Sequence, residues 1–408
     1  MNVRIIGTGL FFTAALAVVA CSSSAPRAGF EESKSPTEPG AGDPGSFTGQ
    51  GKAGNGSCEQ NNTGDPDKDY DGDGYPMKYD CNECDKNVNN GAFDVPGNGI
   101  DEDCNGTPDD EVVDCDTNLP LDGNDAMDAA RAIGLCKTAS ASGKEWGVIE
   151  AQWVRPDGTP LANGGKAALG RGLLAKFGLL PPPAGATMLA LSSGTARGPN
   201  DPGYSSVEGF DKNYSHGAPP GYPKDSTTCG GGGFGGGFGF GGSFDGIALK
   251  VKIRVPSNAQ SFKYQQNFFT AEFPDYVCMD FNDFFVTMMD PKPAGLPDGN
   301  IAFDQDKNPI SVNNSFLQAC KPQSAGGKQF KCPLGPSTLT ATGFQDHGST
   351  GWLTTQAPVA ELRGKEMTLT WAIWDEADGV LDSSALIDDF SWSVDAASGT
   401  QTKPSTPN

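Results

Sequence analysis

Residues 65–116 hold 17 acidic side chains against three lysines, a net charge of −14 within 52 residues. Ionised carboxylates at this density repel one another, so the segment becomes compact only if something neutralises them. The charge is local, because the 292 residues that follow carry 29 acidic and 22 basic side chains. This feature therefore predicts a small cation-dependent module at one place in the chain.

The spacing of these acids fits a known loop template. Residues 69–80 read D-x-D-x-D-G-x5-D, in which positions 1, 3 and 5 converge on one ion, the glycine allows a sharp turn, and positions 7 and 12 complete the shell. The predicted ligands are Asp69, Asp71, Asp73, the carbonyl of Tyr75, and Asp80. Asp80 replaces the usual bidentate glutamate, which lowers the expected coordination number or affinity.

A second half-site follows at residues 101–106, where Asp101, Asp103 and Asn105 precede a glycine. Its position 12 is Val112, so closure must come from Asp109, Glu111 or another segment. A purely oxygen-based ligand set favours calcium, whereas copper and zinc favour imidazole or thiolate. A zinc site at Cys81-x-x-Cys84 and a merely solvated acidic linker are the alternatives.

The two half-sites together resemble the MopE-type metal-binding motif of bacterial surface proteins. The resemblance covers residues 67–111, where two acidic cysteine-containing segments bracket a glycine-containing connector. Cys84 is a departure from that pattern.

The N-terminus predicts export. Residues 1–20 form a signal peptide that ends at Val-Val-Ala-Cys, which resembles the bacterial lipobox and makes Cys21 the lipidated residue. An ordinary signal peptide is the alternative. Residues 21–57 are rich in Gly, Ser and Pro and predict a flexible linker. The expected location is the bacterial cell envelope, with the chain held on the outer membrane by its lipid. The overall charge of −22 argues against nucleic-acid binding.

Cysteine usage agrees with export. Once Cys21 is set aside, ten cysteines remain, an even number that predicts disulfides in an oxidising compartment. The predicted pairs are Cys81–Cys104, Cys115–Cys136 and Cys320–Cys332.

The rest of the chain predicts a mainly β fold. Apolar and polar residues alternate at 247–255 and 367–374, and shorter strand signals occur at 146–155, 187–192, 268–269, 283–286 and 387–392. A single short helix is expected at 124–135. Many short strands between Gly, Pro and Asp turns predict an antiparallel two-sheet β-sandwich, jelly-roll-like, over residues 115–396. The acidic module takes residues 58–114, and residues 397–408 are expected to be a disordered tail.

This β domain resembles the choice-of-anchor L domain of bacterial surface and exported proteins. The resemblance rests on the order of the segments 146–153, 172–178, 188–197, 268–278, 282–286, 299–303 and 382–390. It implies a fold and a cell-surface location, and no catalytic residues.

The sequence therefore predicts a non-enzymatic surface protein for adhesion or for binding a carbohydrate or protein ligand. One alternative is a carbohydrate-binding sandwich with Tyr204, Tyr214 and Tyr222 as the sugar platform. Another is a secreted hydrolase that uses one of three acidic pairs: Glu272/Asp275, Asp280/Asp283 or Asp375/Asp378. We expect these acids to be turn and surface residues.

Overall fold

The computed structural model describes residues 64–110, 114–162, 164–229, 242–279, 281–314 and 316–405. The predicted signal peptide, the lipidated Cys21 and the linker up to residue 57 lie outside the described residues.

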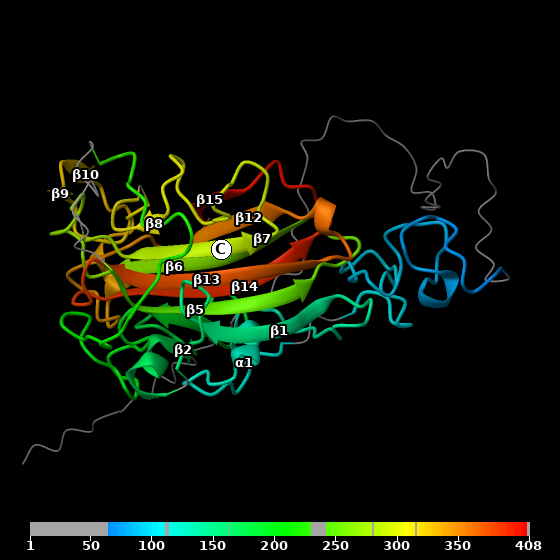
Figure 1. The fold of residues 1–408 in the computed structure, drawn as a ribbon, viewed down its shortest axis with the longest axis horizontal. Helices are drawn as coiled ribbons and strands as arrows, with labels where there is room; N and C mark the ends of the chain where they lie inside the picture. Colours follow the sequence, from blue (N-terminus) through cyan, green and yellow to red (C-terminus); the bar gives the residue numbers. More distant parts are fainter. Residues whose placement is uncertain are drawn as a thin grey trace, which may run out of the picture.

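Two antiparallel sheets face each other and form a β-sandwich, as the sequence predicts (Figure 1). In the first sheet the strand order is β1-β5-β13-β7-β8, with β4 beside β5. Its strands are β1 Gly147–Val154, β4 Ser215–His216, β5 Ser243–Arg254, β7 Phe284–Asp290, β8 Ile310–Ser311 and β13 Glu366–Glu376.

In the second sheet the order is β15-β12-β6-β14-β3-β2, with β11 beside β6. Its strands are β2 Arg171–Leu174, β3 Met188–Ser192, β6 Ser261–Thr270, β11 Gly348–Ser349, β12 Leu353–Pro358, β14 Ser383–Ser393 and β15 Gln401–Pro404. A separate hairpin joins β9 Gln323–Ala325 to β10 Lys328–Phe330. Short 3-10 helices lie at Met77–Tyr79, Gly165–Gly170, Pro336–Leu339 and Ala360–Leu362.

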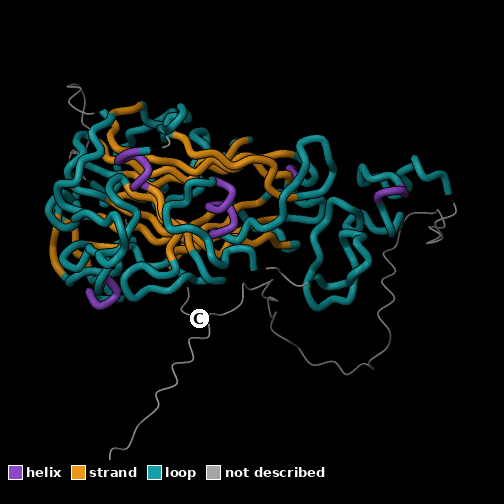
Figure 2. The backbone as a smooth tube through the Cα atoms, turned by 90° about the horizontal axis from the view of Figure 1, so that it is seen from below, coloured by secondary structure: helices purple, strands orange, loops and turns teal. Residues whose placement is uncertain are grey.

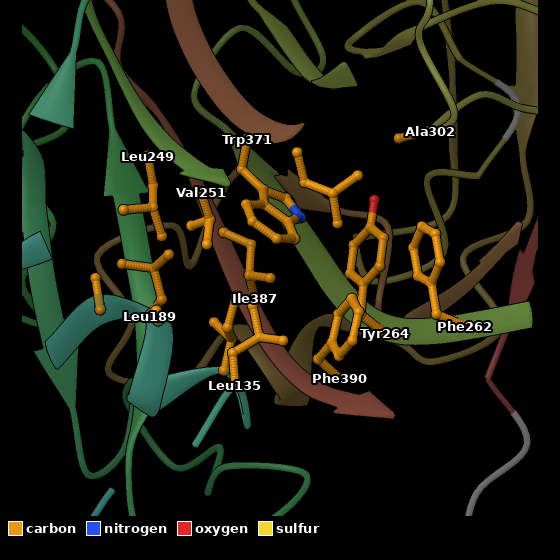
Figure 3. Close-up of a cluster of buried hydrophobic side chains, with 14 of the residues drawn as sticks. Leu135, Leu189, Leu249, Val251, Phe262, Tyr264, Ala302, Trp371, Ile387 and Phe390 are labelled. Carbon is orange, nitrogen blue, oxygen red and sulfur yellow. The ribbon is translucent and has the colours of Figure 1, made fainter. Parts of the chain in front are cut away.

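The period-two pattern of β5 explains the layering. Leu249 and Val251 point into the core, whereas Lys250 between them is exposed. Figure 3 shows residues of the first sheet, among them Trp371, facing Tyr264 and Ile387 of the second. Burial of these large apolar side chains holds the two sheets together.

The predicted helix is present as α1, Ala126–Ala132. The Asp125 side chain accepts a hydrogen bond from the Met127 N–H at 2.9 Å and caps its first turn. Its buried alanines belong to the same core as the strands.

The predicted disordered tail at 397–408 is wrong over the residues that the structure describes. β15 pairs with β12, and the Thr402 and Thr355 hydroxyls lie 2.8 Å apart. The sequence favours disorder here because the segment lacks apolar side chains. An edge strand does not need them, since backbone hydrogen bonds to its one neighbour order it.

All three predicted disulfides are present: Cys81–Cys104, Cys115–Cys136 and Cys320–Cys332. A fourth joins Cys229 to Cys278, a pair that the sequence did not predict. Four disulfides among the described residues indicate an oxidising, extracytoplasmic location.

The acidic segment extends from one end of the sandwich, beyond the last residues of β5 (Figures 1 and 2). Phe93 anchors it: this side chain is 5% exposed and belongs to the main core. The backbone N–H of Phe93 donates to the Asn258 side-chain carbonyl at 3.1 Å, and the Asn258 amide donates back to the Phe93 carbonyl at 2.8 Å. The acidic module is therefore docked on the sandwich.

Candidate metal centre

The first acidic loop is shaped by its own carboxylates. Asp69 accepts hydrogen bonds from the backbone N–H groups of Gly72 and Gly74, at 2.6 and 2.9 Å. Asp71 accepts from the N–H of Asp73, and Asp73 accepts from that of Tyr75. Gly74 has a φ of 97°, which a glycine adopts without strain. The template residues thus wind the backbone into a tight loop.

The second acidic loop repeats this geometry. Asp101 accepts from the N–H groups of Asn105 and Gly106, at 3.0 and 2.9 Å. Asp103 accepts from the N–H of Asn105, whose side chain accepts from that of Thr107. Position 4 has a positive φ in both loops, 79° at Gly72 and 58° at Cys104. The two half-sites of the sequence are therefore two copies of one loop, and the Cys81–Cys104 disulfide links the second loop to the residue that follows the first.

The first loop gathers carboxylates from beyond its own turn. Oxygens of Asp71, Asp73 and Asp80 lie within 4.8 Å of one another, and so do oxygens of Asp69, Asp71 and Glu83. Four predicted carboxylates thus come together, with Asp71 common to both groups. The remaining predicted ligand, the Tyr75 carbonyl, belongs to the same loop, and the Tyr75 hydroxyl donates to the Lys144 carbonyl at 3.1 Å.

Glu83 belongs to this carboxylate cluster, but the sequence analysis did not identify it. It lies three residues beyond the last position of the template, so the template gave no signal for it. One of its carboxylate oxygens accepts the Tyr70 N–H at 2.6 Å, which brings it back over the loop.

In the second loop, only one of the three predicted ligands belongs to a cluster of acids that could hold a metal ion. Asp103 lies with Asp94 and Asp110, their oxygens within 4.8 Å. Asp101 and Asn105 are not in this group; Asp101 holds the loop amides and the Asn105 side chain donates to Asp110 at 2.6 Å. The closing carboxylates come from Asp94 and Asp110.

Two oxygens of the first loop have no hydrogen-bond donor among the described residues. Asp71 and Asp80 each use Oδ1 to accept a backbone N–H, from Asp73 and Asn82 respectively. The Oδ2 atom of each residue is buried and has no such donor, and Asp80 as a whole is only 3% exposed. A buried acceptor without a donor is costly, and a bound cation removes that cost.

The pKa values of the loop carboxylates also favour a bound cation. Burial raises the pKa of Asp80 to about 7, and the neighbouring charges of Asp73, Glu83 and Asp71 add to this effect. Burial, followed by the charge of Asp73, raises the pKa of Asp71 to about 6. These carboxylates resist ionisation on their own, so a nearby positive charge is favoured.

The second loop already has such a charge. The Lys137 ammonium lies 2.9 Å from Asp103 Oδ2. The Asp94 carboxylate accepts backbone hydrogen bonds from Asp103 and Asp110, at 3.0 and 3.2 Å. The first loop is therefore the stronger candidate for a metal.

The donor set fits a hard cation. Cys81 is bonded to Cys104, so the Cys81-x-x-Cys84 zinc pair considered from the sequence is ruled out. The converging ligands of the first loop are all carboxylate oxygens, which Ca²⁺ and related divalent cations prefer.

One buried side chain connects this site to the sandwich. Asn89 is fully buried, and its amide donates to Asp73 Oδ2 at 2.6 Å. Its carbonyl accepts from the Ser257 hydroxyl at 2.7 Å and from the Gly91 N–H at 2.9 Å. Asn89 therefore holds a candidate ligand in place from the β-sandwich side.

We expect Asn89→Ala to lower the affinity of the chain for Ca²⁺ by roughly 10- to 100-fold, the usual effect of losing a group that orients a ligand. Calorimetric titration of the full chain measures this. The matched control is Asn87→Ala, an exposed asparagine whose side-chain amide donates to Asp85, and it should leave the affinity unchanged. Equal affinities for Asn89→Ala and the parent chain would contradict the positioning role.

Two of the three tyrosines considered for a sugar platform make contacts within the sandwich domain. The Tyr222 ring packs edge-on against Phe284 and Trp374, with ring centroids 5.6 and 5.5 Å away. The Tyr214 hydroxyl donates to the Gly246 carbonyl. Tyr204, Tyr214 and Tyr222 are all half-buried.

Three of the six acids considered for hydrolysis are not the surface residues that we expected, because Glu272, Asp283 and Asp375 are only 3%, 2% and 1% exposed. Asp275 is exposed, as expected, and Asp378 is half-buried. Asp280 lies outside the described residues.

Comparison with protein families, with curated proteins and with solved structures finds no match for this chain. Within the described ranges, no helix has both the length and the apolar character needed to cross a bilayer.

Proposed function

We propose that this chain is a calcium-binding lipoprotein of the bacterial cell envelope that acts by binding rather than by catalysis. One observation carries the proposal: Asp71, Asp73 and Asp80 converge, and two of their buried oxygens have no hydrogen-bond donor among the described residues. A divalent cation with oxygen ligands satisfies these acceptors and removes the repulsion between the charges. Calcium is the proposed ion because exported proteins meet it in abundance and its flexible shell tolerates an irregular ligand set.

The cation has a structural role in this proposal. Asp73 contacts Asn89, and Asn89 contacts Ser257 on the sandwich, so an ion on the loop stiffens the junction between the two parts. The acidic module then works as a stem, and the β-sandwich is the part that it displays. Adhesion or binding of an extracellular protein or carbohydrate is the proposed task of the sandwich.

The proposed membrane attachment rests on the lipobox-like sequence at Cys21 and on the disulfides that indicate export. The proposed family is the one that the sequence resembles, a choice-of-anchor L domain behind a MopE-type motif.

Mass spectrometry of the chain purified from bacterial membranes tests this attachment. We expect a mature N-terminus at Cys21 that carries a lipid, and we expect Cys21→Ser to release the chain from the membrane fraction. An unlipidated N-terminus in the parent chain, or the same membrane association in Cys21→Ser, would overturn the proposed attachment.

A further inference from the structure

A second group of acids lies buried at the opposite end of the sandwich. Asp375 is near the end of β13, where Glu376 pairs with Ser243, the first residue of β5. Asp382 immediately precedes β14, whose first residue, Ser383, pairs with Thr270 at the end of β6. The acidic loops contact the other end, beyond the last residues of β5. The two groups are therefore independent sites.

This buried group has far more acidic than basic side chains. Five carboxylates belong to it, and the most exposed is only 3% accessible: Glu272, Asp283, Asp375, Asp382 and Asp245. Among the described residues that act electrostatically on both Asp375 and Asp382, only Lys212 is basic. Its ammonium donates to the Ser192 carbonyl at 2.9 Å. One lysine cannot balance five buried acids.

Three of these carboxylates have conventional partners. Glu272 accepts the Asp283 N–H at 3.0 Å, and Asp283 accepts the Ser383 hydroxyl at 2.6 Å. Asp245 accepts the N–H groups of Lys212 and Tyr214, at 2.5 and 3.2 Å.

The other two carboxylates are different. Both oxygens of Asp375 and both oxygens of Asp382 are buried, and none accepts a well-formed hydrogen bond from the described residues. Each of these residues is 1% exposed. Four such acceptors in one buried place are far from the usual satisfaction of buried polar atoms.

The surroundings hold the Asp382 carboxylate close to the backbone. A side chain at residue 194 would place its Cβ 2.0 Å from Asp382 Oδ2, so any residue larger than glycine there would displace this carboxylate. The Ser193 hydroxyl and the Asp283 carboxylate are neighbours of Asp375. The Lys212 ammonium is the one basic group among the neighbours that act on both Asp375 and Asp382 within the described residues.

Protonation alone does not give all four oxygens of Asp375 and Asp382 a hydrogen-bond partner. Asp283 and Asp375 are close enough to share a proton, which would engage one oxygen of each carboxyl group. Asp382 gains nothing from this arrangement, and a proton on Asp382 would itself need an acceptor. A hard cation accepts several oxygens at once and cancels the charge.

We propose that a divalent cation of the Ca²⁺ class binds between Asp375 and Asp382, beside the hydroxyls of Ser193 and Ser383. Asp375 belongs to the first sheet, and Asp382 leads into the second. The cation therefore ties the two sheets together at the end of the sandwich that faces away from the acidic loops.

The test uses the full chain with the loop site removed by Asp71→Asn plus Asp80→Asn. We expect Ca²⁺ at about 100 times its dissociation constant still to raise the unfolding temperature of this variant, by about 5 °C. Adding Asp382→Asn should abolish that rise. The matched control is Asp378→Asn, which removes a nearby partly exposed acid and should leave the rise intact.

The same variants distinguish loss of the cation from loss of the fold. In EDTA, Asp382→Asn should fold, as judged by circular dichroism, because it removes a buried uncompensated charge. If that variant does not fold, Asp375→Asn replaces it. A loop-deficient chain with no response to Ca²⁺, or an equal response with and without Asp382→Asn, would overturn the proposal. Every variant in this test lacks the loop site. The result therefore does not depend on whether the loop binds calcium.

Discussion

We expect removal of divalent cations with EDTA to lower the unfolding temperature of this protein, and Ca²⁺ to restore it. The expected gain is about 2.7 kcal/mol for each site when free Ca²⁺ is 100 times its dissociation constant, because an ion that binds only the folded chain stabilises it by mass action. The loop carboxylates supply one such gain, since Asp71 and Asp80 each have a buried oxygen without a hydrogen-bond donor among the described residues. Thermal unfolding with and without EDTA measures it.

A paired substitution identifies the loop contribution. Asp71→Asn plus Asp80→Asn should reduce the Ca²⁺ response, and the remaining response is the one proposed for Asp375 and Asp382. In EDTA the same variant should unfold at a higher temperature than the parent chain, because it removes repulsion between buried acids. The control is Asp65→Asn plus Asp67→Asn, two exposed acids of the same segment with the same change in charge. A control variant that behaves like the loop variant would attribute the effect to net charge alone.

Loss of the Cys229–Cys278 disulfide should destabilise the chain by about 4 kcal/mol, against about 3 kcal/mol for Cys320–Cys332. The difference follows from the loops that they close, with sequence separations of 49 and 12 residues. Restricting a longer loop removes more entropy from the unfolded chain.

Urea unfolding of two variants, each with one cysteine pair replaced by alanine, measures these losses. Alanine avoids placing new polar groups where Cys229 and Cys320 are buried. An equal or smaller loss for the Cys229–Cys278 pair would contradict the loop-length argument.

The strands and the close disulfides could be predicted from the sequence because their signals are local. The alternation around Leu249 shows which face of β5 is buried, and Cys320 and Cys332 are close in the chain. The Cys229–Cys278 pair could not be chosen, because the sheet that brings these residues together depends on contacts far along the chain. Strand β15 was not predicted for a related reason: it is held by backbone pairing with β12, which its own side chains do not indicate.

The candidate site shows the same division. The template identifies Asp69, Asp71, Asp73 and Asp80 because one loop contains them all, and local hydrogen bonds shape it. Glu83, Asp94 and Asp110 fall outside the template, and only the folded path of the chain brings them in. The buried acids around Asp375 could not be recognised as buried, because a sequence does not reveal that turns from two sheets meet inside the sandwich.

In the proposed function, the first acidic loop binds a hard divalent cation through ionised carboxylates. Folding raises the pKa of Asp71 to about 6 and that of Asp80 to about 7, from an ordinary 3.8. The cation-free chain should therefore lose stability as pH rises from 3.8 to about 7, whereas Ca²⁺ binding, which needs the ionised forms, should strengthen over the same range.

Calorimetric titration of the full chain with Ca²⁺, at pH 5 and at pH 7.5, measures this binding. We expect a binding heat at pH 7.5, a weaker affinity at pH 5, and loss of one binding site in Asp71→Asn plus Asp80→Asn. No heat at pH 7.5, or the same number of sites and the same affinity in that variant, would contradict it.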